Sequence, residues 1–309
     1  MNYFLIDALN LAYRAHNANY ELKTASGNFS GMFYGFVRTI FSLKKKYRGY
    51  KFEVVWDRKP IHKTALDPEY KAGRASLGDL VTYQISDIQA FLKNAGVDQF
   101  HMEHQEADDV IASLAEKYKT KSGNILIYSN DKDLLQLVED GKVTVYKPKV
   151  AASPEKFYDE EAVRDQFGVP PDKLPCFRSF DGDASDNIRG VSRVPRKIIA
   201  NLVNGYSTVE KIYEILPSQT LTDIQRGHFI EGMDRVLINY KLVALNRHLD
   251  GVICVESEVN KKNLIDLFSK YNIKSINPES IIDIFMSSLN IKYTDPTAVK
   301  KVETYSLFD

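Results

Sequence analysis

Residues 3–7 read "YFLID", a short apolar run that ends in an acid, and the chain repeats this pattern twice. The later runs are "FEVVWD" at 52–57 and "NILIYSND" at 124–131. Short runs rich in Val, Ile and aromatic residues, separated by helical patterns, are typical of buried strands in a mostly parallel sheet. We expect "VTVYKP" at 143–148 to be a further strand.

Helical patterns lie between these runs, around 32–46, around 80–93 and from Asp108 onward. This alternation predicts an α/β fold with a mostly parallel central sheet and helices on both faces. From about residue 159 the pattern changes to successive helices without a clear linker, and a long helix is expected over 230–245. We therefore expect three parts: an α/β core over 1–158, a helical subdomain over 159–290 and a free tail over 291–309.

The composition is that of an ordinary soluble globular protein. No apolar run is long enough to span a bilayer, and the start "MNYFLIDALN" lacks the basic segment of a signal peptide. The two cysteines, Cys176 and Cys254, are distant in sequence and indicate a reducing compartment. We expect a cytoplasmic monomer that does not bind membranes.

Net charge is zero, yet the basic residues are unevenly distributed. One cluster lies between Arg38 and Lys51, and a second contains Arg189, Arg193, Arg196 and Lys197. Charge runs usually form solvated faces. A protein that gathers many acids in one site can also be neutral overall while keeping basic surfaces beside it, so net charge does not decide for or against a nucleic-acid partner.

The acids at the ends of the apolar runs, Asp7, Asp57 and Asp131, are expected at the carboxyl ends of parallel strands, where such sheets bind ligands. The stretch "HQEADDVIA" at 104–112 places Glu106, Asp108 and Asp109 at the start of a helix. Acids at this position stabilise a helix by roughly a few tenths of a kcal/mol each, because they offset its dipole, and this effect alone would account for many such clusters. However, Asp108 lies on the same helical stripe as the apolar residues that follow it, which is costly unless a positive charge meets it.

Two further motifs extend this acidic set: "SNDKD" supplies Asp133, and "FDGDASDNIRGV" supplies Asp183 and Asp186. The candidate metal ligands are Asp7, Asp57, Glu106, Asp108, Asp109, Asp131, Asp133, Asp183 and Asp186. Without counter-ions these acids would repel each other, and hard divalent cations with oxygen ligands, Mg²⁺ or Mn²⁺, resolve the repulsion. No His or Cys belongs to the set, which argues against zinc. Two such ions would suit hydrolysis of a phosphodiester.

These motifs, in this order and spacing, resemble the 5′-nuclease superfamily of flap endonucleases and 5′–3′ exonucleases. The resemblance runs from about residue 3 to residue 250, and the stand-alone bacteriophage enzymes are the most similar in size. It implies a helical arch at about 60–80 over the site and a helix-hairpin-helix-like element in the helical subdomain. We also expect Asp131 and Asp108 at a first metal ion and Asp183 and Asp186 toward a second, because their chain positions put the first pair at the sheet edge and the second pair on the helical side.

The segment "DPEYKAGRAS" at 67–76 resembles the Tyr-Lys-x-x-Arg pattern of the family arch. The resemblance implies that Tyr70, Lys71 and Arg74 meet the scissile phosphate and the threaded 5′ end. A surface role in a polar loop is the alternative.

After the last acids, the family hairpin Gly-Val-x-Gly-Ile-Gly-x-Lys corresponds here to "GVSRVPRK" at 190–197. Arg193 and Pro195 replace two glycines. Pro195 has no N–H, and Arg193 enters a left-handed turn at a higher cost than Gly, so the K⁺ site of this hairpin is in doubt. Arg193, Arg196 and Lys197 could hold DNA phosphates by side-chain charge instead.

The sequence thus predicts a metal-dependent, structure-specific 5′ nuclease that hydrolyses 5′ flaps and primer ends on branched or nicked duplex DNA, or on RNA–DNA hybrids, during replication. A PIN-like ribonuclease would explain the acidic sheet edge but not the arch motif. A non-catalytic nucleic-acid-binding relative should have lost several of the acids. In the tail "ETYSLFD", Tyr305, Leu307 and Phe308 resemble a short sliding-clamp motif, although a frayed end of no function is the alternative.

Overall fold

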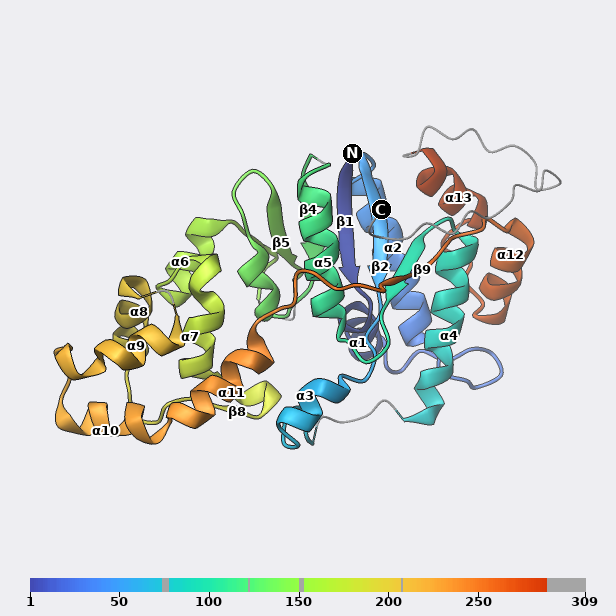
Figure 1. Cartoon of the computed structure of the whole chain (residues 1–309). Coiled ribbons are helices and arrows are strands. Elements are labelled where there is room, and N and C mark those ends of the chain that lie inside the picture. Colours follow the sequence, from blue (N-terminus) through green and yellow to red (C-terminus); the bar gives the residue numbers. More distant parts are fainter. Residues whose placement is uncertain (74–77, 122, 150–152, 207, 288–309) are drawn as a thin grey trace. The chain divides into compact units, whose positions relative to one another are not determined.

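The structure is a computed structural model that describes residues 1–73, 78–121, 123–149, 153–206 and 208–287 (Figure 1). The chain folds into two compact units, and each unit is assembled from separate stretches of sequence. Unit 1 comprises 1–58, 76–129 and 247–309, and unit 2 comprises 59–75 and 130–246. These limits do not coincide with the boundary expected near 158, because segments distant in sequence pack together. The functional division into a nuclease core and a DNA-binding part stays a prediction.

Unit 1 is built on a mostly parallel sheet. In order across the sheet its strands are β4 (Ile125–Tyr128), β1 (Asn2–Asp7), β2 (Tyr50–Val55), β3 (Asp98–His101) and β9 (Ile253–Val255). The first four are mutually parallel, and β9 pairs antiparallel with β3. The three runs expected as strands are therefore confirmed. The edge strand β9 was not expected.

Helices cover both faces of this sheet, as predicted. The helices of unit 1 are α1 (Ala8–Ala18), α2 (Gly31–Lys46), α4 (Asp79–Asn94), α5 (Ala107–Lys119), α12 (Lys261–Lys270) and α13 (Pro278–Ser287), and α12 packs on α4. Consecutive strand residues point to opposite faces. Tyr3 stacks on Tyr118 of α5 at 3.8 Å between ring centroids, whereas Phe4 meets Tyr47, at the end of α2, at 5.2 Å. Helices α5 and α2 therefore lie on opposite faces.

The first basic cluster is not simply a solvated face. Lys44 on α2 is 1% exposed, its ammonium donates to the Tyr50 carbonyl, and it lies 4.8 Å from the centroid of the Phe52 ring. Lys51 is held between Glu53, at 3.0 Å, and Asp98, at 2.9 Å. At these two positions the ammonium groups make contacts inside unit 1, where a carbonyl, a ring and carboxylates are their partners.

Unit 2 is mainly helical. Its helices are α3 (Ile61–Leu66), α6 (Glu160–Phe167), α7 (Leu174–Asp181), α8 (Arg196–Gly205), α9 (Val209–Ile215), α10 (Asp223–Glu231) and α11 (Met233–Val243), with short 3₁₀ turns at Asp133–Leu137, Pro171–Lys173, Ala184–Asp186 and Leu216–Ser218. Strands β5 (Val143–Lys147) and β6 (Lys156–Tyr158) form an antiparallel pair. The strand expected at 143–148 is thus confirmed, whereas the single long helix expected over 230–245 is wrong. The chain ends one helix at Glu231 and begins the next at Met233, with Gly232 between them.

A short hairpin in unit 2 joins β7 (Gly182–Asp183) to β8 (Ile188–Arg189). Its ends approach so closely that only glycine fits. A Cβ at Gly182 would lie 2.4 Å from the Gly190 nitrogen, and one at Gly190 would lie 2.3 Å from the Asp181 oxygen. The two glycines of "DGDASDNIRG" therefore fix the loop that carries Asp183 and Asp186.

No helix in the described residues is long and apolar enough to cross a membrane. Four predicted site residues lie outside the described part of the chain, namely Arg74, Tyr305, Leu307 and Phe308.

Candidate functional site

The acids of unit 1 lie where parallel strands end. Asp7 is the last residue of β1 and caps α1, accepting the Asn10 N–H at 3.1 Å through one oxygen and the Ser129 hydroxyl at 2.8 Å through the other. Its register partner on β2 is Val55, two residues before Asp57. Asp7 and Asp57, two of the three acids expected at strand ends, therefore lie at the same edge of the sheet.

The start of α5 joins the same edge. Asp57 accepts the N–H of Ala107, the first residue of α5, at 3.1 Å. Glu106 precedes the helix, Asp108 and Asp109 lie in its first turn, and all three are buried. The stripe formed by Ile111, Ala115 and Tyr118 is buried as well, so Asp108 does face inward. The positive end of the α5 dipole lies beside these carboxylates.

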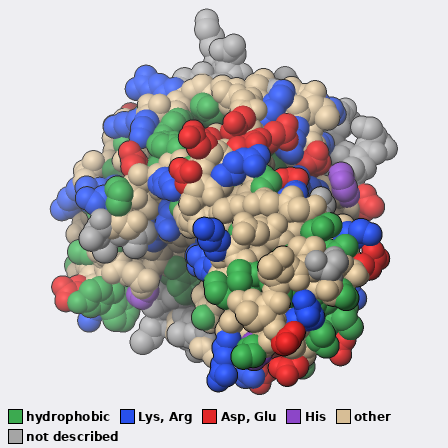
Figure 2. Space-filling view, turned by 90° about the vertical axis from the view of Figure 1, so that its left-hand side faces the viewer, with side chains coloured by type: hydrophobic (Ala, Val, Ile, Leu, Met, Phe, Trp, Pro, Cys, Tyr) green, Lys and Arg blue, Asp and Glu red, His purple; other side chains and the backbone are tan. Residues whose placement is uncertain are grey.

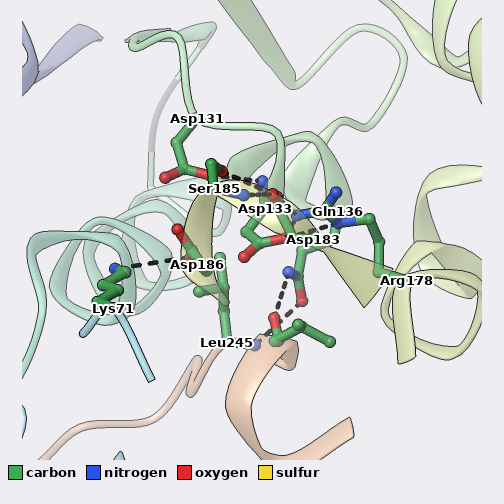
Figure 3. A network of polar contacts seen from close by, with 10 residues as sticks. Lys71, Asp131, Asp133, Gln136, Arg178, Asp183, Ser185, Asp186 and Leu245 are labelled. Atoms are coloured by element: carbon green, nitrogen blue, oxygen red, sulfur yellow. Dashed lines mark hydrogen bonds and ion pairs between the residues drawn. The ribbon is translucent and has the colours of Figure 1, made fainter. Parts of the chain in front are cut away.

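The acids of unit 2 form a second cluster around a buried arginine (Figure 3). Arg178, on α7, is 3% exposed. Its Nε lies 3.1 Å from Oδ1 of Asp133, and its Nη2 contacts both that oxygen and Oδ2 of Asp183. Asp131 joins the cluster by accepting the Asp133 N–H at 2.8 Å. One guanidinium thus supplies positive charge to two of the predicted metal ligands.

The two carboxylates that Arg178 contacts have different pKa values because their surroundings differ. Burial and the neighbouring Asp131 charge raise the pKa of Asp133 to about 7, against the opposing effect of Arg178. Burial alone would raise the pKa of Asp183, but the Ser185 hydroxyl and Arg178 donate to its carboxylate and lower that pKa to about 2. Asp183 is therefore the firmly ionised partner of the guanidinium.

The arch segment supplies a cation to the same cluster. Lys71 donates its backbone N–H to the Asp186 carbonyl at 2.9 Å, and its ammonium lies 3.9 Å from Oδ2 of Asp186. Figure 3 shows the lysine directed toward that carboxylate from the side opposite Arg178. The neighbouring Tyr70 is 4% exposed and packs with Ile188, Leu242 and Val243, so its ring supports the segment from within. Its contact with nucleic acid stays a prediction.

The altered hairpin, residues 190–197, presents exposed basic side chains. Arg193 adopts a φ of 55°, the left-handed conformation in which glycine costs least. The turn is therefore left-handed at this position even though glycine is absent. Arg196 is engaged within the protein: its Nε lies 2.9 Å from Asp181, and its guanidinium lies over the ring of Phe177 at 5.3 Å. Figure 2 shows basic side chains interspersed with acidic and hydrophobic ones on the face in view, not gathered into one field.

The chemistry of the donor set favours a hard cation. All nine predicted ligands are carboxylates, five in unit 1 and four in unit 2. Among the described residues, however, no group of three or more His, Cys, Asp or Glu side chains is placed to hold a metal ion. In unit 2, Arg178 already contacts oxygens of Asp133 and Asp183, so the ligand assignment stays a prediction.

Sequence reasoning missed Arg178 and the partners of the arch segment. A signal for Arg178 was present, because it is the one basic residue in the otherwise apolar start of "LPCFRSFD", directly before the acidic loop. Nothing in the sequence alone indicates which helix face points toward that loop.

A family model and a curated relative identify the family of this chain. The family model for the 5′–3′ exonuclease N-terminal, resolvase-like domain matches residues 2–168. A 5′–3′ exonuclease of Aquifex aeolicus is 35% identical over 248 residues, which cover 80% of this chain and 82% of the relative. The chain therefore belongs to the 5′–3′ exonuclease family of nucleases.

Other relatives agree with this assignment, and solved structures show a similar fold. A 5′–3′ exonuclease of Buchnera aphidicola is 29% identical over 86% of this chain and 96% of its own length. DNA polymerase I of Pseudomonas aeruginosa is 29% identical over 88% of this chain, but the match spans only 30% of the polymerase. The fold is similar to the T5 D15 protein co-crystallised with metal ions, with a TM-score of 0.67, 20% identity and coverage of 92% of this chain and 100% of the other. Flap endonuclease-1 of Methanococcus jannaschii has a TM-score of 0.57 at 14% identity, with coverage of 94% and 91%.

Proposed function

We propose that this protein is a divalent-metal-dependent, structure-specific 5′ nuclease that cleaves 5′ flaps and primer ends on duplex DNA during replication. The main observation in support of this proposal is that buried carboxylates pair with two cations, Arg178 and Lys71, in a chain of this family. Structures of similar fold include the T5 D15 flap endonuclease with DNA and metal ions and the Rad2 catalytic core with DNA substrate, which supports the choice of substrate.

The proposed cofactor is Mg²⁺ or Mn²⁺, with two ions. Asp108 and Asp131 are assigned to the first ion, and Asp183 and Asp186 toward the second. Such ions provide a water nucleophile at neutral pH and stabilise the leaving oxygen. Because Arg178 contacts Asp183, binding of the second ion requires that carboxylate to exchange or share its partner.

The protein's own side chains supply the remaining steps. The Lys71 ammonium, held beside Asp186, stabilises negative charge that develops on the scissile phosphate. Exposed Arg193 and Lys197 hold backbone phosphates of the duplex and so read its shape, not its sequence. A role for Arg74 in the same step is part of the proposal.

Finer features of the function are proposed on the same basis. The protein acts as a cytoplasmic monomer, RNA–DNA hybrids are substrates beside DNA, and the hairpin works without K⁺. The tail motif with Leu307 and Phe308 tethers the enzyme to a sliding clamp, which raises its local concentration at the junction. The runner-up function is a PIN-like ribonuclease, and a single-stranded RNA substrate discriminates it from the flap nuclease.

A labelled 5′-flap duplex tests the proposal. We expect cleavage with Mg²⁺ and none with EDTA. Asp131→Asn should abolish cleavage while binding of the flap persists, because removing a negative charge does not weaken attraction to phosphate. The matched control is Asp172→Asn, which changes an exposed aspartate and should cleave normally. Near-normal turnover by Asp131→Asn would overturn the metal assignment.

A further inference from the structure

The turn at residues 67–71 follows α3 and carries Lys71, and its geometry depends on a residue of α11 that is remote in sequence. We propose that Arg235 is a positioning residue that fixes the Lys71 ammonium through Asp67. This inference rests on the function proposed above, in which Lys71 stabilises charge on the reacting phosphate.

The Asp67 carboxylate links α11 to the turn. One of its oxygens, Oδ2, lies 2.6 Å from Nη1 of Arg235, and the other, Oδ1, accepts the Glu69 N–H at 3.0 Å. The Asp67 carbonyl accepts the Tyr70 N–H at 3.0 Å. Asp67 is only 5% exposed, and the Arg235 guanidinium is the counter-charge that lies against this buried carboxylate. Arg235 thus holds the group that shapes the two residues before Lys71.

The far side of the turn is tied to the acidic loop. Asn187 donates to the Glu69 carbonyl at 3.0 Å, and the Lys71 N–H donates to the Asp186 carbonyl at 2.9 Å. Lys71 itself adopts a φ of 55°. A non-glycine residue stays in this left-handed conformation only when its surroundings impose it. Here the surroundings are Asp67 on one side of the turn and the loop of Asp186 and Asn187 on the other.

Loss of the Arg235 contact should therefore release Lys71 from its strained conformation and move the ammonium away from Asp186. A displacement of about 1 Å at a catalytic group can lower a rate on the order of 100-fold. The loss should appear in the chemical step and not in duplex affinity, because the contact lies within the turn and not at the predicted phosphate-binding side chains.

A double-mutant cycle on the full chain tests this coupling. Single-turnover cleavage of the 5′-flap duplex is measured for Arg235→Gln, Lys71→Ala and the double variant, with duplex affinity and thermal unfolding measured in parallel. We expect Arg235→Gln to lower the rate roughly 10- to 100-fold, with affinity unchanged. In the Lys71→Ala background the same substitution should lower the rate less than about twofold, because the group that it positions is absent.

Two variants separate positioning from general damage. Arg235→Lys keeps a cation and should restore much of the rate. Arg226→Gln, on neighbouring α10, removes an arginine that pairs with the fully exposed Asp223 instead, and should cleave normally. If Arg235→Gln does not fold, Asp67→Asn removes the charge with almost no change in shape and takes its place in the cycle.

Equal losses from Arg235→Gln in both backgrounds would overturn the proposal, as would a fall in thermal stability with the rate unchanged. A normal rate in Lys71→Ala alone would instead overturn the function assigned to Lys71, and this inference with it. The two failures are therefore distinguishable.

Discussion

At the scale of single residues, one buried arginine determines the electrostatics of the unit 2 cluster. Arg178 contacts Asp133 and Asp183 from a position that is 3% exposed. A buried ion pair contributes little net stability, but removal of one partner leaves an uncompensated buried charge. The arginine therefore allows the acids to stay close together before any divalent ion binds.

We predict that Arg178→Met lowers the free energy of unfolding by about 3–5 kcal/mol in EDTA. Added Mg²⁺ should recover part of this loss and raise the melting temperature more in the variant than in the wild type, because binding to the folded state stabilises it. Calorimetry with and without Mg²⁺ measures both effects. As a control, Arg164→Met on α6 removes an exposed ion pair with Glu160 and should cost at most about 1 kcal/mol. Equal Mg²⁺ responses in Arg178→Met and the wild type would contradict the proposed link to metal binding.

Lys44 gives a pH-dependent prediction. Burial lowers the pKa of its ammonium from the ordinary 10.5 to about 8. Below about pH 8 the folded protein bears the full cost of this buried charge. Between about pH 8 and 10.5 the unfolded chain binds more protons than the folded one, so the Lys44 contribution to stability rises with pH. The change is on the order of 3 kcal/mol at most.

Urea unfolding of the wild type and Lys44→Met at pH 7.5 and pH 10 isolates this contribution from those of other groups. The variant should lose stability relative to the wild type as the pH rises. Parallel pH profiles would show that Lys44 titrates normally and is accessible to water.

At the scale of elements, the sequence is a good guide to strands and a poorer one to helix ends. The runs ending at Asp7 and Asp57 are parallel neighbours, because apolar runs of this length can bury both faces. The long helix expected over 230–245 is divided at Gly232. The apolar pattern on both sides of this glycine gave no indication of the break. The partners of Arg178, Asp67 and Arg235 could not be predicted, because they depend on which helix faces pack together.

The altered hairpin, residues 190–197, leads to a prediction about how duplex affinity depends on salt concentration. With Arg193 and Lys197 as phosphate contacts, Arg193→Ala and Lys197→Ala should each reduce the slope of log affinity against log salt by about one unit. Arg196→Ala should reduce it less, because Asp181 already neutralises that guanidinium. Duplex binding measured over a range of KCl and NaCl concentrations gives the slopes. A marked requirement for K⁺ would mean that the hairpin keeps an ion site despite Pro195.

The substitution Arg193→Gly distinguishes the effect of backbone strain from the effect of side-chain charge in the altered hairpin. It should lose the same salt slope as Arg193→Ala. It should also be more stable than that variant by about 1 kcal/mol, because glycine adopts the left-handed turn without strain. Equal stability of the two variants would show that the turn relaxes when the arginine is absent.

At the scale of the whole molecule, each compact unit gathers stretches that are far apart in the chain. Among the described residues, unit 1 takes in 247–287 after the helices of unit 2, and unit 2 takes in 59–73. A reading that follows the chain from one end to the other predicts a boundary near 158 and cannot foresee this exchange. The shared edge of Asp7 and Asp57 was nevertheless predictable, because the ends of neighbouring parallel strands meet at one edge wherever the rest of the chain goes.

The most direct test of the account compares one labelled strand in three contexts: alone, in a full duplex and as a 5′ flap on a duplex. All three are incubated with the protein and Mg²⁺, and single-turnover rates are measured together with the length of the released fragment. A structure-specific 5′ nuclease should cleave the flap near its junction much faster than the same strand alone, and Lys71→Ala should lower the flap rate on the order of 100-fold or more. Equal cleavage of all three, or preferred cleavage of single-stranded RNA of the same sequence, would contradict the account and favour a PIN-like ribonuclease.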